Sequence, residues 1–61
     1  MIFQVRTEAD LERHKKIQAT IRGDYGVRYT GWYFWDETGV DAIGPFETYQ
    51  ECLRAKADYE P

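Results

Sequence analysis

The chain has 61 residues, of which 43% are hydrophobic and 16% aromatic, and its formal net charge is −3. A chain of this length makes one domain, residues 1–61, near the lower limit of what folds alone. The single cysteine, Cys52, excludes an internal disulfide, and the single histidine, His14, has no partner at metal-ligand spacing. Self-association is the remaining way to stabilise so small a core, and we therefore expect a homodimer without a cofactor.

The sequence gives no sign of export or membrane insertion. The apolar start, Met1-Ile2-Phe3, is followed at once by Gln4 and Arg6, which is not the pattern of a secretory signal. No apolar run approaches the length of a membrane span. Together with a lone cysteine, these features predict a cytoplasmic protein with no membrane partner.

Charge is distributed unevenly along the chain. Residues 1–30 carry a net charge of +2, whereas residues 31–61 carry −5. An ordinary solvated surface explains such a pattern, and so does a polarised molecule that pairs head to tail or presents an acidic side to a basic partner.

The first third of the chain predicts a strand followed by a helix. Residues 2–6 alternate in the manner of a short strand. Thr7 is a good N-cap, and acidic residues in the next turn suit the helix dipole, so a helix is expected over residues 8–22, ending at Gly23. The apolar stripe of this helix is thin, and residues 17–21 alternate with period two, so a strand there is the competing interpretation.

Residues 29–35, Tyr-Thr-Gly-Trp-Tyr-Phe-Trp, are the most informative stretch of the sequence. Five aromatic side chains in seven residues favour a strand. Side chains alternate across a strand, so one face would hold Val27, Tyr29, Gly31, Tyr33 and Trp35, and the other Arg28, Thr30, Trp32, Phe34 and Asp36. Aromatic groups therefore occupy both faces, and a small chain is expected to cover only one of them.

The turn after this strand sets the register of a hairpin. Residues 36–39, Asp-Glu-Thr-Gly, fit a type I turn closed by a glycine in the left-handed region, which would place Phe34 opposite Ala42. The interior face would then hold Trp32, Phe34, Val40 and Ala42. A four-residue loop without the bulge would instead move the pairing by one and exchange the faces.

The last third of the chain predicts a second helix. Pro45 should end the second hairpin strand, expected over residues 40–43, because proline has no amide proton to donate. Thr48 followed by Glu51 is a capping-box pattern that starts a helix over residues 49–59. The predicted fold is therefore α+β, a three-stranded antiparallel sheet with two helices on one face, in the order β-α-β-β-α.

No catalytic motif emerges from the remaining residues. The chain contains no serine to pair with His14, and Cys52 is far from His14 in sequence and falls on an apolar helix side. The carboxylates of Asp36, Glu37 and Asp41 cluster near the predicted turn, but so small a chain offers no cleft for paired-acid chemistry. We expect a protein that is not an enzyme.

Part of the C-terminal half resembles a known group of proteins, through Trp32-Tyr33-Phe34-Trp35, then Ile43-Gly44-Pro45-Phe46-Glu47-Thr48, then Cys52 and Ala55. An aromatic hairpin that leads into Gly-Pro-Phe and a Thr-capped helix is similar to a tail found in small bacteriophage and bacterial orphan accessory proteins. The resemblance covers about half of the chain and includes no catalytic residue. It implies a compact accessory protein that binds and modulates a host protein.

The sequence thus predicts a non-enzymatic interaction protein that modulates or inhibits a host protein through an aromatic sheet face with an acidic rim. The expected partner-binding residues are Tyr29, Tyr33, Trp35, Asp36, Glu37, Asp41 and Ile43. One alternative is a nucleotide or small-ligand module at a homodimer interface. Another is single-strand nucleic-acid binding by Arg28 and the neighbouring rings, which the acidic residues at the same end disfavour.

Overall fold

The computed structural model describes residues 1–59. Its elements are β1 (Ile2–Val5), α1 (Glu8–Thr20), β2 (Gly31–Trp35), β3 (Ala42–Phe46) and α2 (Tyr49–Tyr59). The strands form one antiparallel sheet in the order β1-β2-β3. This arrangement confirms the α+β class and the β-α-β-β-α order predicted from the sequence.

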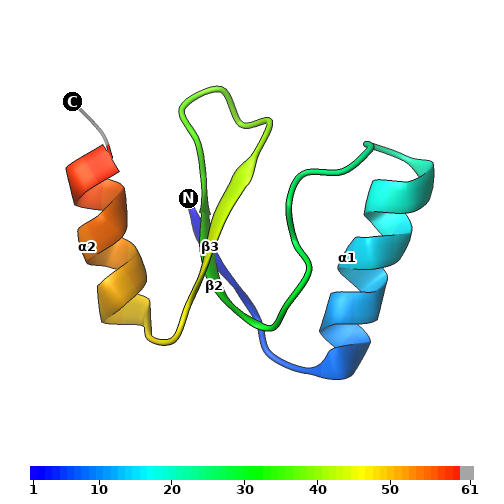
Figure 1. Cartoon of the computed structure of the whole chain (residues 1–61), viewed down its shortest axis with the longest axis horizontal. Coiled ribbons are helices and arrows are strands. Elements are labelled where there is room, and N and C mark those ends of the chain that lie inside the picture. Colours follow the sequence, from blue (N-terminus) through cyan, green and yellow to red (C-terminus); the bar gives the residue numbers. More distant parts are fainter. Residues whose placement is uncertain (60–61) are drawn as a thin grey trace.

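The two helices lie on opposite faces of the sheet, with α1 on one side and α2 on the other (Figure 1). The expectation that both would cover the same face is wrong. The physical reason lies in β2, where Tyr33 and Phe34 point in opposite directions and are 0% and 1% exposed. A single layer of helices would leave one of these rings in water, so one helix covers each.

Helix α1 begins as predicted and ends slightly early. The Thr7 hydroxyl accepts a hydrogen bond from the Asp10 amide at 3.1 Å, and the Asp10 carboxylate in turn accepts one from the Arg6 amide at 3.3 Å. Residues 17–20 are helical, so the competing strand interpretation is wrong. Ile21 is the C-cap, and its side chain is exposed.

The connection from α1 to β2, residues 21–30, lies between the helix and the sheet (Figure 1). Its Tyr25 and Val27 side chains are buried. They complete the cluster on this face, which is formed by Val5, Leu11, Tyr25, Val27 and Tyr33 with Phe3, Ile17, Trp35 and Ala42 packed around it. Helix α1 can cover this face with few apolar residues, because Tyr25 and Val27 of the connection fill the rest of the core.

The β2–β3 hairpin adopts the register that the four-residue loop predicts. Trp35 lies opposite Ala42 and Phe34 opposite Ile43, not Phe34 opposite Ala42. The Asp36 amide donates to the Asp41 carbonyl at 2.9 Å and closes a loop of four residues between them. When the pairing of two strands shifts by one residue, each side chain of the shifted strand moves to the other face of the sheet. Ala42 therefore faces α1, and Ile43 faces α2.

Strand β3 continues through Pro45, so the expectation that this proline would end the ladder is wrong. The pairing with β2 is irregular between Trp32 and Phe34, where β3 carries one extra residue. Gly44 lies there with a φ of 153°, and a Cβ on it would lie 2.6 Å from the Trp32 carbonyl oxygen and 2.8 Å from the Tyr33 ring. Glycine at position 44 allows this close approach of the two strands. The bulge therefore lets β3 continue through Pro45, although proline has no amide proton for the ladder.

Helix α2 begins as predicted, with the Thr48 hydroxyl accepting a hydrogen bond from the Glu51 amide at 3.1 Å. It covers the second face of the sheet with Cys52 fully buried and with aromatic contacts at both ends. These contacts join Trp32 to Tyr49 and Phe34 to Tyr59, with ring centroids 5.3 Å and 5.6 Å apart.

Candidate functional site

The structure divides the seven predicted binding residues among different places. Tyr33 is fully buried, and its hydroxyl donates to the Tyr29 carbonyl at 2.6 Å. Desolvation raises the pKa of this phenol, and hydrogen bonds from the backbone partly oppose the shift. Tyr33 is therefore a core residue, and its predicted contact with a partner is wrong for this structure.

Two further residues lie away from the predicted cluster. Ile43 pairs with Phe34 and therefore lies on the face that α2 covers. Tyr29 is 64% exposed, but it precedes β2, whereas Trp35 ends that strand. The aromatic face expected from the sequence is therefore not a continuous surface.

The other four residues, Trp35, Asp36, Glu37 and Asp41, do lie together at the end of the hairpin. The side chain of Asp36 stabilises the turn, because its carboxylate accepts hydrogen bonds from the Thr38 hydroxyl at 2.9 Å and the Val40 amide at 3.0 Å. Desolvation acts to raise the pKa of Asp36, but these and further hydrogen bonds hold it below its ordinary value. Glu37 and Asp41 are exposed.

Arg22 joins the end of α1 to this hairpin. Its guanidinium donates to the Gly39 carbonyl at 3.1 Å and lies 4.9 Å from the Trp35 ring centroid and 5.2 Å from that of Tyr25. Such cation–π contacts orient the arginine and cover part of the indole. Trp35 is therefore half-buried under the protein's own arginine.

Two apolar side chains beside this contact are strongly exposed. Ile21, next to Arg22, is 78% exposed, and Val40, next to Gly39, is 60% exposed. We call the area formed by Ile21, Arg22, Trp35, Glu37, Val40 and Asp41 the hairpin-tip surface. Sequence reasoning missed Ile21 and Val40, because it placed Ile21 within the predicted helix over residues 8–22 and Val40 on the interior face of a strand expected to begin at residue 40.

A shallow groove of about 550 Å³ lies elsewhere, at the end of the sheet where β2 begins. Its lining residues are Gln4, Val5, Arg6, Thr30, Gly31, Trp32, Pro45, Phe46 and Glu47. Arg6 and Glu47 provide opposite charges, so the groove favours neither an anion nor a cation. Trp32 is half-buried there against Tyr49.

His14 forms a structural pair with Tyr25. The His14 Nδ1 atom and the Tyr25 hydroxyl are 2.7 Å apart, and the imidazole stacks on Phe3 with centroids 5.5 Å apart. Desolvation lowers the pKa of His14, with a further contribution from Arg13, and desolvation raises the pKa of Tyr25. Cys52 belongs to the helix on the opposite face of the sheet, so its thiol does not accompany this histidine (Figure 1).

The lowered pKa of His14 predicts that stability depends on pH. The unfolded chain binds a proton near the ordinary value of 6.5, whereas the folded chain resists protonation until lower pH. Stability is therefore fully present above pH 6.5 and should fall as the pH drops below it. Urea unfolding followed by tryptophan fluorescence on either side of that pH measures the effect.

His14→Gln is the control, because glutamine keeps a group that can bond the Tyr25 hydroxyl but does not titrate. This variant should lose most of the pH dependence in that window. An unchanged slope would assign the effect to other groups.

Within residues 1–59, no group of three or more histidine, cysteine or acidic side chains is arranged to hold a metal ion. In the same part of the chain, neither helix has the length and apolar character that a membrane crossing requires. Comparison with known protein families, curated proteins and solved structures finds no match to this chain.

Proposed function

We propose that this chain is a non-enzymatic, cytoplasmic interaction protein that binds and modulates another protein through its hairpin-tip surface. The observation that carries the proposal is the exposure of Ile21 and Val40, the sequence neighbours of the two residues, Arg22 and Gly39, that join α1 to the hairpin. Arginine and tryptophan are enriched at the energetic centres of protein interfaces, and exposed apolar side chains near them add area that a partner can bury.

The surface is held in place before any partner arrives. Arg22 connects the end of α1 to the hairpin loop, and Asp36 organises that loop through hydrogen bonds to Thr38 and Val40. A preformed surface loses little conformational entropy on binding, which favours affinity.

The charge around the surface favours a basic segment of the partner. Glu37 and Asp41 are exposed, and the ion pairs found among residues 1–59 lie on α1 and between Asp24 and Arg28, away from these carboxylates. Residues 31–61 carry a net charge of −5. Long-range attraction of this kind speeds the encounter and makes it sensitive to salt.

The stacking platform needed for single-stranded nucleic acid is not formed by the described residues. Tyr33 is buried, Trp35 lies under Arg22, and Arg28 is paired with Asp24. The groove beside Trp32 is the remaining place for the alternative of a small ligand. Its volume lies within the range of small-molecule pockets, but it is shallow and its charges are mixed.

A capture experiment with matched variants tests the proposal. Val40→Asp should lower the affinity for the captured partner by roughly tenfold, because burying a valine side chain against a partner is worth about 1.5 kcal/mol. Leu53→Asp is the control, since Leu53 is also apolar and 47% exposed but lies on α2. Affinity would be measured by surface plasmon resonance at low and at raised salt.

The two variants must give different results for the proposal to stand. A partner that binds the wild type and Leu53→Asp equally, and Val40→Asp weakly, supports the hairpin-tip surface. Equal binding by all three proteins would place the contact elsewhere. Glu37→Lys should slow association and reduce its salt dependence if the partner is basic.

A further inference from the structure

Strand β1 is an edge strand whose outer backbone groups have no partner in the described chain. The Trp35 amide donates to the Met1 carbonyl at 3.3 Å, so Met1, Phe3 and Val5 direct their backbone groups toward β2. By alternation, the N–H and C=O groups of Ile2 and Gln4 point away from the sheet. They form a short row of two donors and two acceptors.

The other edge of the sheet is closed by the chain itself. On β3 the Ala42 amide donates to the Tyr25 carbonyl at 2.8 Å, and Pro45 has no amide proton. The bulge at Gly44 also breaks the regular row of groups. Natural edge strands are commonly blocked by proline, bulges, lysine or a covering loop. Strand β1, with the sequence Ile-Phe-Gln-Val, is short but contains no proline, lysine or bulge.

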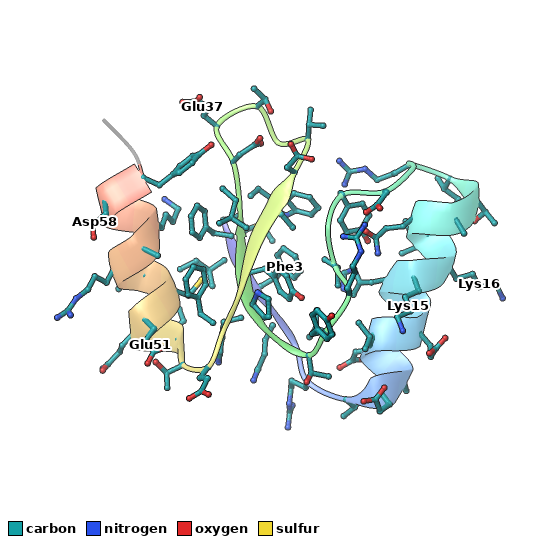
Figure 2. All side chains as sticks on the ribbon, viewed as in Figure 1. Phe3, Lys15, Lys16, Glu37, Glu51 and Asp58 are labelled. Atoms are coloured by element: carbon teal, nitrogen blue, oxygen red, sulfur yellow. The ribbon has the colours of Figure 1, made fainter. Side chains whose placement is uncertain are left out.

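The shape of the molecule presents this edge on a broad side. The backbone measures 32 × 24 × 13 Å, and the view down the shortest axis shows the three strands overlapping between the two helices (Figure 1). The edges of the sheet therefore open onto the two broad sides. Figure 2 shows that Phe3, from β1, lies at the middle of this view. A stable interface buries about 800 Å² on each partner, and the two sides that measure 32 × 24 Å are the broadest that the molecule offers.

We propose that two copies of this chain pair through their β1 edges, antiparallel about a twofold axis at Phe3, to form a continuous six-stranded sheet. In this register Ile2 of each copy exchanges both backbone hydrogen bonds with Gln4 of the other. All the outward groups of Ile2 and Gln4 are then satisfied. Pairing centred on Gln4 would instead require the Arg6 amide, which already donates to Asp10.

The side chains also suit a symmetric contact, in which the same patch must complement itself. Phe3 stacks on Tyr33 and Trp35 with centroids 5.4 Å and 5.2 Å apart, and only part of its ring is buried. In a non-hydrogen-bonded antiparallel pair, the two Phe3 residues face each other at close Cα separation. The exposed parts of the two rings would then contact each other across the twofold axis.

This dimer does not depend on the hairpin-tip surface. Strand pairing about a twofold axis leaves α1 of both copies on one face of the joined sheet and α2 of both on the other. The two hairpin tips point to opposite ends of the dimer, so each stays free for a different protein. Loss of one contact therefore need not affect the other.

Sedimentation equilibrium across the micromolar to millimolar range tests the proposal. The wild type should show twice the chain mass of 7.2 kDa at the upper end of this range. Gln4→Pro removes one outward donor without removing a bond to β2, so it should raise the dimer dissociation constant at least tenfold. Gln4→Ala keeps the backbone donor and should sediment like the wild type.

Hydrogen exchange provides a measurement that needs no variant. The amides of Ile2 and Gln4 should become protected as the wild-type concentration rises, whereas exposed amides elsewhere should not. A wild type that stays at 7.2 kDa throughout would overturn the proposal and leave the edge to an extended segment of a different protein. A folded Gln4→Pro protein that still dimerises like the wild type would overturn it too.

Discussion

Replacing Gln18 with alanine is expected to destabilise the fold by about 3 kcal/mol, a large fraction of the stability of so small a domain. The side-chain oxygen of Gln18 accepts hydrogen bonds from the backbone amides of Tyr25, Gly26 and Val27, at 3.0, 2.9 and 3.0 Å. Its amide nitrogen donates to the Val27 carbonyl at 2.8 Å. Alanine would leave the Tyr25 and Val27 amides and the Val27 carbonyl without this partner, while the Gly26 amide would keep its hydrogen bond to the Asp24 carboxylate at 2.8 Å.

Denaturant unfolding followed by circular dichroism measures this loss. Gln50→Ala is the matched control, since Gln50 also lies in a helix but is exposed, and it should change stability by less than about 0.5 kcal/mol. Gln18→Glu should fall between the two, because its oxygens still accept from the three amides but none can donate to Val27. Equal stability of Gln18→Ala and the wild type would contradict the role assigned to this side chain.

Tyr33→Ala is the second substitution with a large expected effect, a loss of about 3–5 kcal/mol. Tyr33 is 0% exposed, stacks on Phe3 and donates its hydroxyl proton to the Tyr29 carbonyl. Removing the ring creates a cavity between the sheet and the connection that precedes it. Thermal or denaturant unfolding would show a sharply lowered midpoint or an unfolded chain.

Tyr29→Ala removes the same side chain from a position that is 64% exposed. Its backbone carbonyl remains available to Tyr33, so its stability should stay within about 0.5 kcal/mol of the wild type. The pair distinguishes the structure from the sequence interpretation, in which both tyrosines belong to one binding surface. Similar losses in the two variants would contradict the burial described for Tyr33.

Local signals in the sequence predict the elements well. Thr7 and Thr48 mark both helix starts, and each hydroxyl accepts the expected amide three residues on. Gly39, with a φ of 73°, closes the turn that Asp36 begins. These features depend on residues close together in the chain, so their chemistry can be recognised without knowing the fold.

Register and burial were harder to predict because they depend on distant residues. The sequence allows two hairpin registers that differ by one residue, and Ile43 changes face between them. The burial of Tyr33 depends on residues 21–30 folding between α1 and the sheet, which no local pattern in that segment indicates. The candidate site was therefore predicted in part, with its acidic residues and Trp35 correctly placed at the hairpin and Ile21 and Val40 missed.

The position of residues 21–30 between α1 and the sheet has a consequence for local motion. Helix α1 is joined to this segment by the hydrogen bonds of Gln18 and by the contact between His14 and Tyr25, and both pack on the sheet through the cluster around Tyr33. Separating the helix from this segment breaks those links together, so the two should open and close as one cooperative unit. Opening of this unit would expose the Tyr33 side of the sheet while α2 still covers the Phe34 side, so the amides of α1 should exchange no later than those of β2.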